Sequence, residues 1–135
     1  MKGLFVDTAG WMAMADAADP RHEAAARARD TWLRRGALLV STDFVLDETL
    51  TLIRVRLGLP AAARWWDQVE SSARVRWEPV GKDRLERARR WFFQWPDQRF
   101  SFTDCTSFVV MRELDLKSAL TTGRHFRHAG FTVVP

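Results

Sequence analysis

The sequence has few of the residues that build covalent or zinc-based scaffolds. Cys105 is its single cysteine, so no disulfide can form within the chain, and a reducing cytoplasm is the expected compartment. Three scattered histidines (His22, His125 and His128) give no cluster with zinc-ligand spacing. Glycine-rich phosphate loops and G-x-S-x-G nucleophile motifs are also missing. These absences exclude disulfide-rich scaffolds, zinc sites of the common types and hydrolases built on a nucleophile elbow.

Long hydrophobic runs are missing as well. No apolar stretch approaches the ~20 residues that span a bilayer, so no membrane segment is expected. Asp7 interrupts the N-terminal MKGLFVDTAGW too early for a secretory leader. The chain of 135 residues is nevertheless 47% hydrophobic and 12% aromatic, without low-complexity tracts. We therefore predict one folded domain over residues 1–135, with a core of its own.

Short apolar runs alternate with longer stretches of helical periodicity. Strands are predicted at 3–6, 37–40, 75–80, 119–121 and 131–134. Helices are predicted at 8–14, 19–36, 44–57, from 60 onward, at 82–95 and at 101–114. Strands that alternate with helices predict an α/β fold, with a central parallel β-sheet of about five strands sandwiched between helices. Ligands bind such sheets outside the carboxyl ends of the strands.

Three acids stand in positions that call for an explanation. Asp7 ends the first strand, and Asp104 begins the most apolar helix. Glu48 falls outside the polar arc of its helix, between Leu52 and Val55, where a buried carboxylate would need a partner or a cation. Each acid also has an ordinary explanation: a turn or helix cap for Asp7, a boundary glutamate whose head reaches water, and a capping box for Asp104.

Taken together, Asp7, Glu48 and Asp104 are predicted to meet at one metal site. Three carboxylates that met without a cation would repel one another. Oxygen-only ligands suit Mg²⁺ or Mn²⁺, which keep several waters and share the phosphate oxygens of a substrate. Such ions activate water and stabilise charge that builds on phosphorus. The three acids are thus the candidate metal ligands and catalytic residues.

At these residues the sequence resembles the PIN-domain ribonucleases, especially the VapC-type toxins of bacterial toxin–antitoxin pairs. The resemblance covers essentially the whole chain and is carried by FVDTAGW (5–11), STDFVLDETLTLIR (41–54), SFTDCTSFVVM (101–111) and ALTTGRHFRHAGF (119–131). It places the family's successive acids on Asp7, Glu48 and Asp104. It implies an α/β/α sandwich, an acidic pocket for Mg²⁺ or Mn²⁺ and endonucleolytic cleavage of RNA. Homodimers and an antitoxin that blocks the pocket are also implied.

The sequence departs from the family pattern at one position. The family usually has a fourth acid after the paired threonines, here Thr121 and Thr122, and this chain has Gly123. Fewer carboxylates predict that a second metal ion binds weakly or not at all. Two interpretations stay open: a metal-dependent endoribonuclease toxin, or a weakened or inactive PIN-like domain that binds RNA or antitoxin. A receiver-type signalling domain is disfavoured, because no lysine follows Lys117.

The basic residues are mostly arginines. Three of the 21 are lysines, and the formal net charge is +4. Arginine forks suit phosphate, so nucleic acid is a plausible partner, although an Arg-rich solvated surface explains the same charge. The run 82–90 fits a solvated helix face. Arg124 and Arg127 flank the expected pocket mouth and are the better candidates for phosphate contact.

Overall fold

Five short strands form one parallel sheet, as the sequence predicts. In a computed structural model that describes all 135 residues, they are β1 (Gly3–Val6), β2 (Leu38–Thr42), β3 (Val75–Glu78), β4 (Ser118–Leu120) and β5 (Thr132–Val134). Their spatial order is β3-β2-β1-β4-β5, and every neighbouring pair is parallel. The central strand β1 is buried along its whole length, which explains its unbroken apolar sequence.

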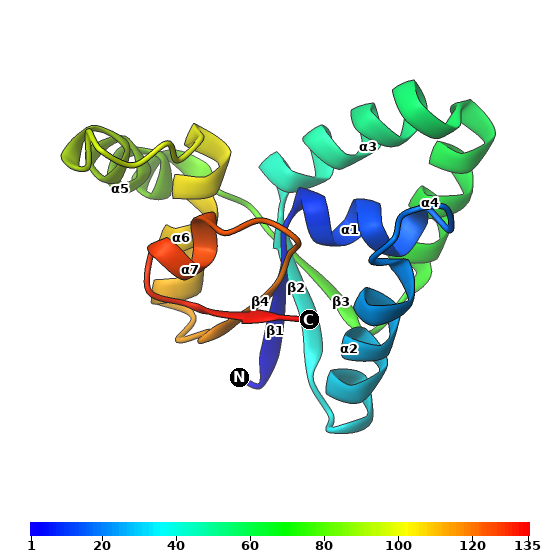
Figure 1. Cartoon of the computed structure of the whole chain (residues 1–135). Helices are drawn as coiled ribbons and strands as arrows, with labels where there is room; N and C mark the ends of the chain where they lie inside the picture. Colours follow the sequence, from blue (N-terminus) through cyan, green and yellow to red (C-terminus); the bar gives the residue numbers. More distant parts are fainter.

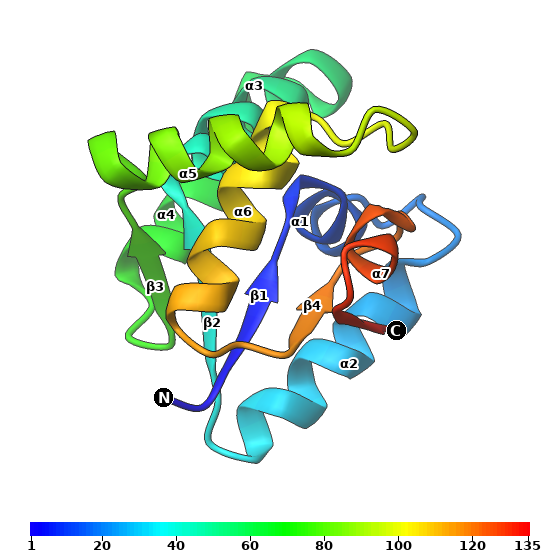
Figure 2. The same cartoon turned by 90° about the vertical axis from the view of Figure 1, so that its left-hand side faces the viewer.

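Helices cover both faces of the sheet (Figures 1 and 2). One face carries α1 (Thr8–Ala15), α2 (His22–Arg34), α3 (Asp43–Leu57) and α4 (Leu59–Ser71). The other carries α5 (Gly81–Gln94), α6 (Phe102–Glu113) and the single turn α7 (His125–His128). Figure 1 shows α3 and α5 rising on either side of the edge where the strands end. The predicted α/β sandwich is therefore confirmed.

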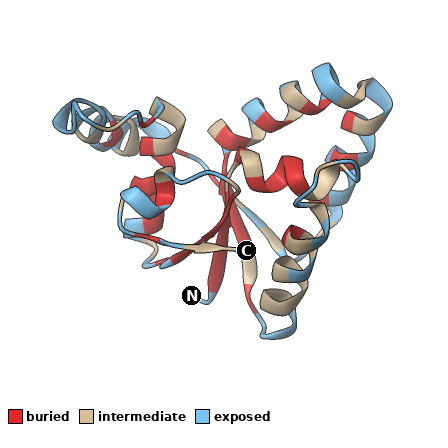
Figure 3. Ribbon diagram, in the orientation of Figure 1, coloured by how far each residue is buried: buried red, intermediate tan, exposed pale blue.

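The face under α6 is held by a cluster of aromatic rings around Phe108. The Phe108 ring lies 5.0–5.7 Å, between centroids, from those of Trp91, Phe100, Phe126 and Phe131. All seven residues from 105 to 111 are buried. Figure 3 shows that the buried residues gather on the sheet and on the sides of the helices that face it. This stretch of α6 is buried on all sides because the helix lies between the sheet and α5. The first turn of α6 is thereby fixed over the sheet edge.

On the opposite face, α1 is pressed against β4 at Gly10. A side chain at this position would place its Cβ only 2.2 Å from the carbonyl oxygen of Leu120. Glycine is therefore required by the close approach of two backbones, not by an unusual φ angle. This contact brings the end of β1 and the end of β4 together, which is the arrangement the candidate site needs.

Several element boundaries differ from the sequence-based prediction. The second strand, β2, ends at Thr42, two residues later than predicted. The second helix begins at His22, because the Asp19 carboxylate accepts from the backbone N–H of Arg21 and closes a turn before it. The third strand ends at Glu78, two residues earlier than predicted. The turn α7 was not predicted, since four residues give no helical periodicity to detect. No helix combines the length and apolar character of a membrane span.

The basic run 82–90 does more than face solvent. Arg84 and Arg87 on α5 both pair with Glu113 on α6, and Arg84 also reaches the buried Glu78 at 3.1 Å. Arg90 remains on the solvated side, 3.9 Å from Glu86. Part of this arginine face therefore fastens α5 to α6 and to the end of β3.

Candidate active site

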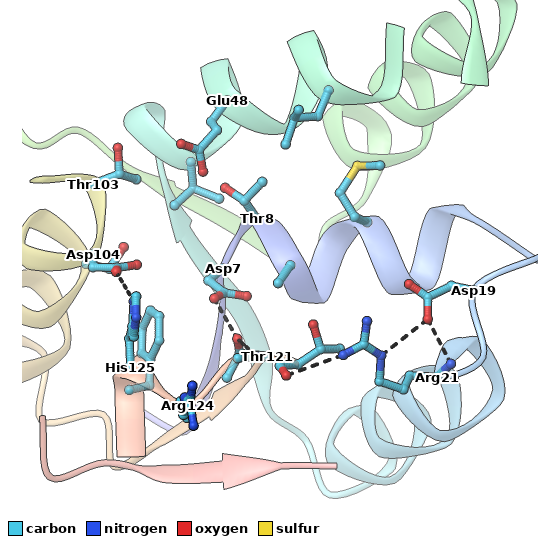
Figure 4. Close-up of a pocket in the computed structure, with 18 of the residues that line it drawn as sticks. Asp7, Thr8, Asp19, Arg21, Glu48, Thr103, Asp104, Thr121, Arg124 and His125 are labelled. Atoms are coloured by element: carbon cyan, nitrogen blue, oxygen red, sulfur yellow. Dashed lines mark hydrogen bonds and ion pairs between the residues drawn. The ribbon is translucent and has the colours of Figure 1, made fainter. Parts of the chain in front are cut away.

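The three predicted acids line one pocket at the carboxyl edge of the sheet. The chain leaves β1 toward β2 on one side and leaves β4 toward β5 on the other, so the edge between β1 and β4 is a topological switch point. A pocket of about 470 Å³ lies there. Asp7 from the end of β1, Glu48 from α3 and Asp104 from α6 all line it (Figure 4).

Asp7 is held rigidly by two donors. Its Oδ1 accepts from the backbone N–H of Gly10 at 2.8 Å, which makes Asp7, and not Thr8, the N-cap of α1. Its Oδ2 accepts from the Thr121 hydroxyl at 2.6 Å. Burial raises the pKa of Asp7 from 3.8 to about 7, with further repulsion from Asp104 and Glu48, against the lowering effect of the two hydrogen bonds. The negative charge of Asp7 is therefore unfavourable in the metal-free protein.

Asp104 forms the capping box and also faces the pocket. The Ser101 hydroxyl accepts from the Asp104 N–H at 2.9 Å, and Asp104 Oδ2 accepts from the Ser101 N–H at 3.0 Å. Ser101 is thus the N-cap of α6, as the capping-box interpretation of Asp104 requires. The same Oδ2 lies 2.7 Å from Nδ1 of His125. Asp104 Oδ1 has no hydrogen-bond partner in the protein, so it remains available to a ligand.

Glu48 lies on α3, on the other side of the pocket from α6. Its side chain is exposed and makes no hydrogen bond or ion pair. Val55, which the helical pattern places on the buried side next to Glu48, is 75% exposed, so burial on that side is wrong. Glu48 and Leu52 instead line the pocket, and Figure 4 shows the Glu48 carboxylate directed into it.

No three His, Cys, Asp or Glu side chains are already arranged to hold a metal ion. The donors present nevertheless fit a hydrated Mg²⁺ or Mn²⁺, which binds through a few carboxylates and keeps several waters. Glu48 and Asp104 Oδ1 are free oxygen donors. The hydroxyls of Thr8 and Ser107 line the same pocket, are buried and have no partner in the protein. Buried hydroxyls normally have partners, so these two indicate a polar ligand such as metal-bound water.

Several pocket residues were missed from sequence. Ser107 follows Asp104 by three residues and so shares its helix face, a spacing that could have identified it. His125 was set aside as one of three scattered histidines, because nothing in the local sequence links it to Asp104. Arg56 also lines the pocket and follows Glu48 by eight residues on α3, a spacing that could have identified it. Arg21 lines the pocket as well, from a segment without a motif of its own. Of the two predicted arginines, Arg124 lines this pocket and Arg127 does not.

Comparison with known proteins decides the family. The PIN-domain family model matches residues 4–132. The chain belongs to the PIN-domain family. Its similarity to PIN toxins extends over nearly its whole length: it is 36% identical to the "23S rRNA-specific endonuclease VapC20" of Mycobacterium tuberculosis over 131 residues, 97% of each chain. It is also 30% identical to "Ribonuclease VapC26" of the same species over 141 residues, 98% of this chain and all of that protein.

Solved structures agree with this assignment of the PIN fold. The crystal structure of Mycobacterium tuberculosis VapC20, described as a sarcin-ricin loop cleaving toxin, superposes with a TM-score of 0.88 and 35% identity. That match covers 98% of this chain and 100% of VapC20. FitAcB from Neisseria gonorrhoeae gives a TM-score of 0.67 at 13% identity, over 98% and 96% of the two chains. The second match supports the fold alone.

Proposed function

We propose that this PIN domain is a metal-dependent endoribonuclease, the toxin of a toxin–antitoxin pair. The observation that carries the proposal is the convergence of Asp7, Glu48 and Asp104 on one pocket, where the other two acids help to raise the pKa of Asp7. Both curated relatives are named as RNA-cleaving enzymes. Residues 1–135 form one PIN-like domain in this proposal.

In this mechanism Asp7, Glu48 and Asp104 hold Mg²⁺ or Mn²⁺, directly or through water. When bound, the ion supplies an activated water and neutralises charge at the backbone phosphate. The protein supplies fixed geometry. Thr121 and Gly10 orient the Asp7 carboxylate, and Ser101 and His125 hold Asp104 through one oxygen so that the other faces the pocket. These hydrogen bonds orient Asp7 and Asp104 before substrate arrives, whereas the three acids are not yet arranged around one metal position.

The proposed substrate is structured ribosomal RNA. VapC20 is named for its action on 23S rRNA and is described as cleaving the sarcin-ricin loop. Similarity over 97% of both chains supports the same substrate class for this chain. The positive side chains Arg21, Arg56 and Arg124, which line the acidic pocket, would offset the repulsion between RNA phosphates and the three carboxylates.

The second candidate function is a binding module that holds RNA or antitoxin without cutting it. Gly123 favours this candidate, because it stands where the family usually has a fourth acid. The structure leaves room for one: the nearest atom to a Cβ built on Gly123 is the Thr121 hydroxyl oxygen, at 3.8 Å. Steric exclusion therefore does not explain the absence of the acid.

The proposal includes a homodimer, a cognate antitoxin and a cytoplasmic location. Trp65, Trp66 and Trp91 lie on apolar strips of helices, for which a dimer face and core packing are equal explanations from sequence. Trp65 is buried and Trp91 half-buried, which fits core packing, whereas Trp66 is exposed. Phe93 and Trp95 are also exposed, at 71% and 47%. Light scattering of the isolated chain, alone and with its antitoxin, tests the homodimer and the antitoxin complex.

Cleavage assays separate the two candidate functions. Ribosomal RNA and a mixed RNA pool are incubated with the wild type and with Asp7→Ala, in Mg²⁺, in Mn²⁺ and in chelator. Asp67→Asn, at an exposed site on α4, is the matched control. Metal-dependent cutting that is lost only in Asp7→Ala supports the nuclease. If folded wild type and Gly123→Asp both fail to cut at high metal concentration, the binding module is correct.

A further inference from the structure

A second pocket adjoins the acidic pocket across the turn that follows β4. It has a volume of about 460 Å³. The turn residues Thr121, Thr122 and Gly123 line both pockets, as do Arg21 and Arg124. Arg127 lines only the second pocket, and no acidic side chain lines it at all. The two pockets therefore share one wall. The acidic pocket is lined by carboxylates as well as arginines, whereas the charged side chains of the second pocket are all arginines.

Hydrogen bonds on both sides hold this turn in place. The Thr121 hydroxyl donates to Asp7 and accepts from the backbone N–H of Gly123 at 3.2 Å. On the other side, Nη1 of Arg21 donates to the carbonyl oxygen of Thr122 at 3.5 Å (Figure 4). The turn is thus a fixed ridge between the two pockets, and the position of Arg21 is tied to it.

The arginines of the second pocket lack anionic partners facing it. Arg124 and Arg127 are exposed and make no ion pair or side-chain hydrogen bond in the protein. Arg21 has one carboxylate partner, Asp19, at 3.4 Å, which lies on the acidic-pocket side. Three guanidinium groups beside a pocket without an acid form a local positive field. Their planar forks match phosphate oxygens, which can accept two hydrogen bonds from each.

Gly123 preserves this positive field. Its φ angle is not positive, and a Cβ would fit, so neither backbone nor packing requires glycine. An aspartate at this position would put a carboxylate on the ridge, directly next to Arg124 in sequence. That carboxylate would compete with an incoming anion for the arginines. The glycine therefore keeps the arginines available, in addition to removing a metal ligand.

We propose that the second pocket binds a backbone phosphate of the RNA strand, next to the phosphate held over the three acids. The inference rests on the proposed function, because it takes RNA as the substrate. A strand that crosses the Thr121–Gly123 ridge contacts both pockets at once, with one phosphate at the acids and a neighbouring one between Arg124 and Arg127. Such contacts position the strand and carry no base specificity.

RNA binding without metal tests this assignment, because chelator prevents cutting. The affinity of a fluorescent single-stranded RNA for the full chain is measured by anisotropy across about 50–200 mM salt. Arg124→Ala and Arg127→Ala are each expected to weaken binding and to lower the slope of log K against log salt by about 1. Arg35→Ala is the matched control, since Arg35 is exposed and unpaired and lies in the turn between α2 and β2, at the amino end of that strand. It should leave both quantities unchanged.

Substitutions of Gly123 separate charge from shape. Gly123→Asp is expected to weaken RNA binding about as much as loss of one arginine, and Gly123→Asn, with the same bulk and no charge, to weaken it much less. Equal effects of Asp and Asn would overturn the electrostatic argument. Arg124→Ala and Arg127→Ala variants that bind like Arg35→Ala would overturn the phosphate site itself. Thermal melts of each variant identify loss of folding.

The proposed function and the phosphate site fail in different ways. Cleavage is measured in parallel, with Mg²⁺ or Mn²⁺ restored. Suppose that the chain never cuts RNA, but Arg124→Ala and Arg127→Ala still lower the salt dependence of binding. The phosphate site is then supported and the nuclease assignment is refuted. Suppose instead that the chain cuts RNA normally, but both variants keep the wild-type slope of log K against log salt. The nuclease assignment is then supported and the phosphate site is refuted.

Discussion

Neutralising Asp7 should stabilise the metal-free protein at high pH. The perturbation is Asp7→Asn, which keeps the shape of the side chain and an oxygen that can accept from the Gly10 N–H. In the wild type, burial raises the pKa of Asp7 to about 7 from 3.8. The folded state therefore binds a proton more strongly than the unfolded state does. This bound proton stabilises the folded state fully below about pH 4, and the stabilisation is lost as pH rises through 7.

The expected size follows from the two pKa values. Their difference corresponds to about 4 kcal/mol between the protonated and charged forms. The asparagine gives up the hydrogen bond from the Thr121 hydroxyl, which contributes roughly 1–3 kcal/mol when one partner is charged. Above pH 8 the variant should thus be more stable than the wild type by about 1–3 kcal/mol. Near pH 4 the advantage should disappear or reverse.

Urea unfolding in chelator, at intervals from pH 4 to 8.5, measures the difference. Asp67→Asn, an exposed aspartate on α4, is the control and should follow the wild-type profile. Mg²⁺ or Mn²⁺ at pH 8 should then raise the stability of the wild type, since the ion binds only the folded state, and should do so much less in Asp7→Asn. Parallel pH profiles of wild type and Asp7→Asn would refute the reasoning, because they would show that the buried charge carries no penalty.

Three further predictions concern the frame around the site. Gly10→Ala should destabilise the protein by at least about 2 kcal/mol in urea unfolding, because its Cβ would overlap the Leu120 carbonyl; an unchanged midpoint would contradict the close approach. Phe108→Ala should cost about 3–5 kcal/mol by the same assay, since four aromatic rings surround it. Burial raises the pKa of the Cys105 thiol to about 12, so a thiol reagent at pH 8 should react only at the rate of unfolding; fast labelling of folded protein would exclude this burial.

Much of the fold could be predicted because the sequence marks it locally. The unbroken apolar run before Asp7 indicated a strand buried on both faces, and the stretch from Cys105 to Met111 indicated a helix buried on all sides. Both lie where they were expected. The boundaries that were missed depend on single hydrogen bonds, such as the one that closes the turn before His22. Hydrophobic periodicity carries no information about such bonds.

The candidate site was predictable only in part. Asp7, Glu48 and Asp104 could be selected because each is an acid in a position where sequence pattern alone does not require one. Arg56 could also have been selected, because it follows Glu48 by eight residues on α3 and so shares its helix face. His125 and Arg21 could not, since their relevance comes from contacts across long stretches of chain. The partner of His125 is 21 residues away, and the carbonyl that Arg21 contacts is 101 residues away. Periodicity within one helix cannot report such contacts.

The raised pKa of Asp7 also bears on how the site responds to the lost fourth acid. A further carboxylate beside Asp7 would add repulsion to a group that burial already disfavours in its charged form. Gly123 removes that repulsion, so the metal-free pocket tolerates the three remaining acids at lower cost. The same substitution reduces the charge that attracts a second cation. In the proposed metal site, Gly123 therefore lowers the affinity for a second cation, reduces repulsion in the metal-free pocket and leaves Arg124 without an acidic neighbour at position 123.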